Sequence, residues 1–122
     1  MSSHLFVYGT LRHGCERHET LSNQRFLGCA ATIMKCRLVD CGSYPALVES
    51  TDGVSVRGEL YEVDRKCLEK CDAVEGVLEG LYERRLIDVA SVDDAFVRVE
   101  AWVYFYRHST VNLPNHGNEW TG

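Results

Sequence analysis

Clusters of basic residues are scarce in this 122-residue sequence, and their scarcity limits the functions open to it. Lysine and arginine total 13 against 18 aspartate and glutamate residues, which leaves a formal net charge of -5. The most basic groups, Arg65-Lys66 and Glu83-Arg84-Arg85, both have acidic neighbours. A nucleic-acid surface needs clustered lysine and arginine to neutralise phosphates. The composition therefore argues against nucleic acid as a partner.

Long apolar runs are missing as well. No stretch approaches the roughly 20 apolar residues that a membrane-spanning helix needs. The first residues, Met1-Ser2-Ser3-His4, lead straight into an apolar strand pattern, without the basic segment and apolar core of a secretory signal. We therefore expect no membrane partner and a cytoplasmic location. With 45% hydrophobic and 25% charged residues, residues 1–122 fit a single globular domain.

Six cysteines raise the question of disulfides or a metal. They are Cys15, Cys29, Cys36, Cys41, Cys67 and Cys71. Disulfide-stapled secreted domains are smaller and richer in loops, and most of these cysteines lie inside apolar patterns, where cysteine acts as a small hydrophobe. The Cys67-x-x-x-Cys71 spacing differs from that of a structural zinc site. We predict free thiols and no bound metal.

A nucleophilic cysteine is a further possibility. Cys15 lies in one loop region with His13 and His18, and a Cys–His pair can carry covalent catalysis. Nothing in the sequence orients these side chains, so a plain surface loop is the preferred interpretation.

Short strand patterns dominate the chain. We expect strands over residues 4–8, over 25–40 with a bend or bulge at Gly28, from 46 onward, over 54–63 after an Asp52-Gly53 hairpin turn, over 82–90 and over 96–106, with a helical turn at 16–22. Helices do not separate these strands. The pattern therefore predicts an α+β protein with a mainly antiparallel sheet or a small barrel.

One helix is predicted clearly, from Asp64 as N-cap through residues 65–74 to Gly76. Leu68, Cys71 and Glu75 share one face. The opposite side is expected to be solvated, and it carries Arg65, Lys66, Glu69, Lys70 and Asp72. The negative end of the helix dipole and apolar surroundings both disfavour an anion, so they would raise the pKa of Glu75 toward the range of a general base or acid. The alternative is a frayed helix end with Glu75 pointing to water.

The turn Tyr8-Gly9-Thr10-Leu11 ends the first strand pattern. Backbone N–H groups at such a tip can form a concave site for an anion such as a carboxylate. Gly9 is expected to need freedom in φ there. The alternative is a simple turn from strand to loop.

Several short motifs follow one another along the chain, and their order is more specific than any one of them. They are Tyr8-Gly9-Thr10-Leu11, Ser43-Tyr44-Pro45, Val56 to Asp64, Asp72-Ala73-Val74-Glu75-Gly76, Tyr82-Glu83-Arg84, Ala101 to Tyr106 and Gly117-Asn118-Glu119-Trp120. Together they resemble the gamma-glutamylcyclotransferase-like family, in its gamma-glutamylamine cyclotransferase and AIG2-like branch. Residues 76–81 depart from the pattern, since they lack a proline that often follows the family's glutamate, and this affects the alignment of Tyr82.

The resemblance implies a small, mixed, mainly antiparallel β-barrel with flanking short helices. It also implies a reaction in which the α-amine of a small gamma-glutamyl substrate attacks its own γ-carbonyl and releases 5-oxoproline and a free amine, without a cofactor. Glu75 would act as general base and acid. Backbone N–H groups of Gly9, Thr10 and Leu11 would hold the substrate α-carboxylate, and Tyr8, with Tyr44 and Tyr82 as further candidates, would line the site.

A second hypothesis is a catalytically silent module that binds a small metabolite or a partner in the same cavity. Glu75 favours the enzyme, because a binding site for an anionic substrate gains nothing from an added carboxylate. Other side chains are expected to be structural: Arg84 and Arg85 on a solvated face with one salt bridge, Trp102 in the core, and His4 and His116 in solvent. Arg84 is also a candidate for steadying a carboxylate, and Arg84 or Arg85 is the alternative anion site, by direct charge pairing, if the turn does not hold the carboxylate.

Overall fold

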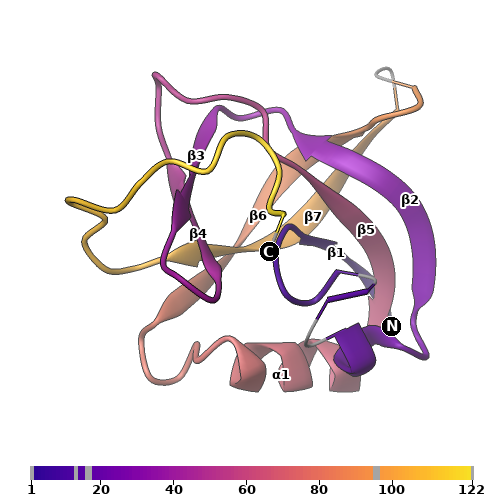
Figure 1. Cartoon of the computed structure of the whole chain (residues 1–122). Helices are drawn as coiled ribbons and strands as arrows, with labels where there is room; N and C mark the ends of the chain where they lie inside the picture. The colour runs from indigo at the N-terminus through magenta and orange to yellow at the C-terminus, as the bar shows by residue number, and fades with distance from the viewer. Residues whose placement is uncertain (1, 13, 16–17, 95–96, 122) are drawn as a thin grey trace.

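The computed structural model describes residues 2–12, 14–15, 18–94 and 97–121. Its elements are β1 (Ser2–Val7), the 3-10 helix η1 (His18–Leu21), β2 (Arg25–Thr32), β3 (Cys36–Asp40), β4 (Pro45–Glu49), β5 (Arg57–Asp64), α1 (Arg65–Val74), β6 (Tyr82–Ser91) and β7 (Arg98–Tyr106). Strands β1-β5-β2-β6-β7 close a barrel, while β3 and β4 form a separate two-stranded sheet (Figure 1). The predicted α+β class with a small mixed barrel is confirmed.

The barrel is antiparallel except where it closes. Strand β1 pairs with β7 in parallel, with Leu5 opposite Trp102. Side chains alternate along β1 and the residue after it: Phe6 and Tyr8 join the core shared by the barrel and the β3–β4 sheet, whereas Leu5 and Val7 pack with α1 residues. The end of β1 therefore lies between the barrel interior and helix α1, which is drawn below the barrel in Figure 1.

The prediction of one long strand over residues 25–40 is wrong. The expected bulge is present, with a register shift between Phe26 and Gly28 and a φ of 122° at Gly28. The strand nevertheless stops at Thr32, whose hydroxyl donates to the Met34 carbonyl at 2.8 Å and accepts from Val56 N–H at 3.0 Å. The Thr32 hydroxyl thus occupies the Met34 carbonyl and the Val56 N–H, two backbone groups that would otherwise be available for strand pairing. Strand β2 therefore ends here, and β3 belongs to a second sheet.

The predicted hairpin at Asp52-Gly53 is also wrong. A tight turn exists, since Gly53 N–H donates to the Ser50 carbonyl at 3.0 Å. However, β4 pairs with β3, while β5 starts at Arg57 and pairs with β1 and β2. A Cβ on Gly53 would lie 2.1 Å from the Cys36 carbonyl oxygen. Gly53 is therefore needed where the chain passes close to β3 on its way from one sheet to the other.

Helix α1 begins and ends as predicted. Asp64 Oδ1 accepts from Cys67 N–H at 2.7 Å. At the other end Gly76 has a φ of 69°, and the N–H groups of Gly76 and Val77 donate to Ala73 and Asp72 carbonyls at 3.2 and 3.0 Å. This glycine-based cap fixes the last turn. Glu75 is thus held at a defined position directly before the chain turns away.

Several side chains differ from expectation. Asp72 is half-buried rather than solvated, Trp102 is only half-buried with the Arg84 guanidinium 4.5 Å from its ring centre, and His4 and His116 are half-buried. All six cysteines are free thiols, as predicted, although Cys29 is exposed. None of the described helices is long and apolar enough to cross a membrane.

Candidate active site

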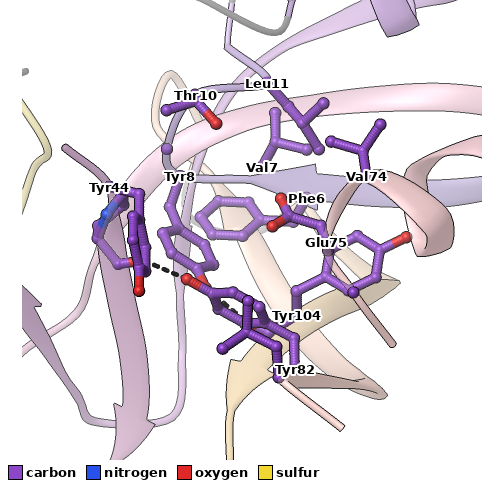
Figure 2. A pocket seen from close by; sticks show the side chains of 14 residues that line it. Phe6, Val7, Tyr8, Thr10, Leu11, Tyr44, Val74, Glu75, Tyr82 and Tyr104 are labelled. Atoms are coloured by element: carbon purple, nitrogen blue, oxygen red, sulfur yellow. Dashed lines mark hydrogen bonds between the residues drawn. The ribbon is translucent and has the colours of Figure 1, made fainter. Parts of the chain in front are cut away.

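A cavity of about 160 Å³ lies where the end of β1, the start of β4, the end of α1 and the start of β6 meet (Figure 2). Its lining residues are Phe6, Val7, Tyr8, Gly9, Thr10, Leu11, Tyr44, Pro45, Val74, Glu75, Gly76, Leu81, Tyr82 and Tyr104. The structure thus brings all seven predicted site residues around one space, including the two further candidates Tyr44 and Tyr82.

Glu75 enters this space from the end of α1. Figure 2 shows its carboxyl group pointing into the cavity beside the Phe6 ring, on the side opposite Tyr44. The side chain is half-buried, and the glycine cap holds its backbone. A frayed helix end with Glu75 in open water therefore does not describe the structure. The carboxyl group can reach a ligand in the cavity.

Two buried tyrosines are fixed by backbone carbonyls. The Tyr8 hydroxyl donates to Tyr104 O at 2.5 Å, and the Tyr82 hydroxyl donates to Pro45 O at 2.6 Å. Burial raises the pKa of both phenols, and the nearby Glu75 carboxylate raises the pKa of each further. Both phenols therefore stay protonated at neutral pH, and each hydroxyl proton is engaged in the hydrogen bond to its backbone carbonyl. Toward a ligand their oxygens can therefore act as acceptors.

The Gly9 to Leu11 turn offers donors. None of the hydrogen bonds among the described residues uses the N–H of Gly9, Thr10 or Leu11. No arginine, lysine or histidine is found among the described residues that line the cavity. An anionic ligand group would therefore depend on these N–H groups and on the Thr10 hydroxyl.

Gly9 is required for a reason that differs from the expected one. Its φ does not lie in the left-handed region. A Cβ on Gly9 would lie 2.7 Å from Pro45 Cγ, so the glycine is needed for close contact with β4. The turn and Pro45 thus pack directly against each other at the cavity wall.

Sequence reasoning missed a polar group behind the cavity. Tyr104, which lines the cavity, donates its hydroxyl to Asp72 Oδ1 at 2.7 Å. Arg84 Nη1 forms an ion pair with Asp72 at 3.0 Å. Asp72 lies one turn before Glu75, so this pair ties the last turn of α1 to β6 and β7. The Asp72-to-Gly76, Tyr82-to-Arg84 and Ala101-to-Tyr106 motifs contained Asp72, Arg84 and Tyr104 but gave no signal that these side chains touch.

The rival candidates lie away from the cavity lining. Arg85 Nη2 pairs with Glu49 at 3.1 Å, and His18 Nδ1 donates to the Leu11 carbonyl at 3.0 Å. Cys15 lies 3.8 Å from Arg12 Nη2, while His13 lies outside the described residues. Among the residues that the structure describes, no group of three or more histidine, cysteine, aspartate or glutamate side chains could hold a metal ion.

Comparison with known proteins identifies the family of this chain. The family model for gamma-glutamyl cyclotransferase, AIG2-like, matches residues 5–122. The chain belongs to this family. The predicted resemblance is thereby confirmed, and membership in this family supports an enzyme of the gamma-glutamylcyclotransferase kind.

Individual relatives support the assignment. A Methanocaldococcus jannaschii protein, whose name proposes gamma-glutamylcyclotransferase activity, is 35% identical over 116 residues, which cover 94% of this chain and 93% of the relative. The rat gamma-glutamylaminecyclotransferase is 35% identical over 95 residues, covering 71% of this chain and 63% of the rat protein. A crystal structure of an AIG2-like protein from Mus musculus superposes with a TM-score of 0.88 at 28% identity, covering 98% and 88% of the two chains.

The Tyr82–Pro45 contact leads to a stability prediction. Replacing Tyr82 by Phe removes the buried donor to the Pro45 carbonyl and leaves that acceptor unpaired. We expect the free energy of unfolding to fall by about 1–3 kcal/mol, measured by urea denaturation. An unchanged value would show that this hydrogen bond does not hold β4 against the barrel.

Proposed function

We propose that the protein is a gamma-glutamyl cyclotransferase that releases 5-oxoproline and a free amine from a gamma-glutamyl amine or amide. One observation carries the proposal: the Glu75 carboxyl group and the Tyr8 to Leu11 turn, far apart in sequence, line the same cavity. The reaction requires a group that moves protons and a group that holds the substrate's carboxylate, and this cavity offers both.

The size of the cavity suits the gamma-glutamyl half of a substrate. At about 160 Å³ it is smaller than the roughly 300–1,000 Å³ of pockets for drug-sized ligands. The leaving amine would therefore extend out of the cavity, past Tyr44 and residues 77–81. These segments would decide which amine is accepted, whereas the gamma-glutamyl half would be common to all substrates.

Binding would fold the substrate for its own cyclisation. The α-carboxylate would lie on the N–H groups of Gly9, Thr10 and Leu11, and the α-amine would face Glu75. The phenol oxygens of Tyr8 and Tyr82 are acceptors and can receive hydrogen bonds from that amine. The amine and the γ-carbonyl belong to one molecule, so binding favours the attack by fixing the folded conformation in which the two groups meet.

Glu75 would then move the protons. As a carboxylate it accepts a proton from the α-amine as the amine nitrogen bonds to the γ-carbon. The protonated Glu75 next gives that proton to the leaving nitrogen, and the bond from the γ-carbon to this nitrogen breaks. The products are 5-oxoproline and a free amine, no water is consumed, and Glu75 returns to its starting state.

A silent binding module remains the second candidate, and it predicts ligand binding without turnover. Incubation with a panel of gamma-glutamyl amino acids, gamma-glutamyl amines and gamma-glutamyl-lysine, scored for 5-oxoproline, separates the two. We expect at least one compound to release 5-oxoproline and free amine in equal amounts. Binding of the panel without any 5-oxoproline would favour the module.

Chelation provides a further prediction. The proposed steps need a carboxyl group and backbone N–H groups, and no Lewis acid. We expect 5-oxoproline release to be unchanged after exhaustive dialysis against a chelator. Activity that disappears on dialysis and returns with added zinc would contradict the mechanism.

A further inference from the structure

Arg12 directly follows the Tyr8 to Leu11 turn and binds the backbone of this turn through the Gly9 carbonyl. Its backbone N–H and its Nε both donate to the Gly9 carbonyl at 3.1 Å. The side chain is 12% exposed, and Arg12 is absent from the residues that line the cavity. A nearly buried guanidinium thus lies on the opposite side of the turn from the proposed substrate.

The same guanidinium binds the C-terminal segment. Arg12 Nη2 donates to the Trp120 carbonyl, and Nη1 lies 3.8 Å from Glu119 Oε2. Trp120 is only 3% exposed and belongs to the core, and Asn118 accepts from the Arg57 N–H at 2.7 Å. Figure 1 shows the C-terminal end beside the loop that follows β1. The segment Asn118–Trp120 is therefore anchored by the buried Trp120 and by the bond to Arg57, and it holds the Arg12 side chain in place.

Peptide geometry connects Arg12 to the cavity. The carbonyl of Gly9 and the N–H of Thr10 belong to one peptide group, and all described peptide bonds are trans. In a trans peptide these two groups point in opposite directions. Since the Gly9 carbonyl points at Arg12, the Thr10 N–H points away from Arg12, and Thr10 lines the cavity.

We propose that Arg12 is a positioning residue for the substrate carboxylate, itself held by the C-terminal segment Asn118–Trp120. It fixes the Gly9–Thr10 peptide so that the Thr10 N–H is presented to the anion. A cation on the carbonyl also polarises the peptide, which strengthens the N–H as a donor. This inference rests on the proposed function only in placing a carboxylate at the turn. It supplies positive charge for a cavity whose described lining residues include no cation.

The test compares two ligands that differ at one group. Binding of 5-oxoproline and of its primary carboxamide is measured by calorimetry for wild type, Arg12→Gln, Arg12→Lys and the exposed control Arg37→Gln. We expect wild type and Arg37→Gln to prefer the carboxylate. In Arg12→Gln the ratio of the affinity for 5-oxoproline to the affinity for the carboxamide should fall about tenfold. Arg12→Lys keeps the charge but cannot bond two carbonyls in a fork, so its loss should be intermediate.

A merely structural role for Arg12 would weaken both ligands equally and leave the preference unchanged, and this result would overturn the inference. A wild type without preference for the carboxylate would overturn it as well. If Arg12→Gln does not fold in a thermal melt, Arg12→Lys decides the question by the same ratio. Release of 5-oxoproline is measured in parallel, because its absence would refute the proposed reaction while leaving the carboxylate preference to be judged separately.

Discussion

Replacing Glu75 by Gln is expected to reduce release of 5-oxoproline by about a hundredfold or more while substrate binding is largely kept. Glutamine has nearly the same shape, but it cannot accept the proton of the attacking amine. The helix end should survive, because the cap depends on the backbone and on Gly76 rather than on this carboxylate. Steady-state kinetics should show the loss in kcat, with calorimetry of 5-oxoproline binding as the companion measurement.

Glu83→Gln is the matched control, since Glu83 is an exposed carboxylate on β6, next to Tyr82 in sequence. It removes one negative charge without touching the cavity and should leave kcat within about twofold of wild type. A folded Glu75→Gln protein with near-normal turnover would refute the catalytic role of Glu75.

Gly9→Val should abolish binding of 5-oxoproline. A Cβ at this position would lie 2.7 Å from Pro45 Cγ, and valine adds two further methyl groups. Either the turn must move, which displaces its N–H groups, or the start of β4 must move, which displaces Tyr44 and Pro45 in the cavity wall. Overpacking of this kind costs about 1–3 kcal/mol of stability, so thermal melts should accompany the binding measurement.

Thr10→Ala is the companion variant for the turn. It removes a hydroxyl but keeps the N–H groups of Gly9, Thr10 and Leu11, so binding should weaken only modestly. A folded Gly9→Val protein that binds 5-oxoproline like wild type would place the anion site elsewhere. Arg84 and Arg85, considered for that role from the sequence, already pair with Asp72 and Glu49.

Local rules were sufficient to predict the limits of α1. An N-cap at Asp64, a regular apolar face and a glycine after Glu75 each act within a few residues, so the helix limits follow from the sequence. The orientation of Glu75 did not follow from them, because a frayed helix end fitted the same pattern. The turn after β1 is similarly local. The order of family motifs added what local rules lack, namely that these two segments belong to one cavity.

Strand partners could not be predicted in this way. The Asp52-Gly53 turn indicated a hairpin, but strand pairing depends on contacts far along the chain, and β5 pairs with β1 and β2 instead. The end of β2 depends on the Thr32 hydroxyl bonding to Val56, a residue 24 positions away. Such contacts leave no periodic signal in the sequence.

The supporting residues of the cavity were missed for the same reason. Asp72 lay on a helix face that the pattern assigned to solvent, yet Arg84 and Tyr104 from two strands reach it. Arg12 had no visible partner, since the Trp120 carbonyl that it binds comes from the other end of the chain. A charged residue that is nearly buried by distant segments is recognised only once the fold is known.

The origin of the product's oxygen atoms tests the central claim most directly. A gamma-glutamyl amine that the protein turns over is incubated in water enriched in oxygen-18, and the products are analysed by mass spectrometry. Intramolecular attack by the α-amine predicts unlabelled 5-oxoproline and one equivalent of free amine, because no water enters the reaction. Glutamate with oxygen-18 in its γ-carboxylate would show hydrolysis and would contradict the account.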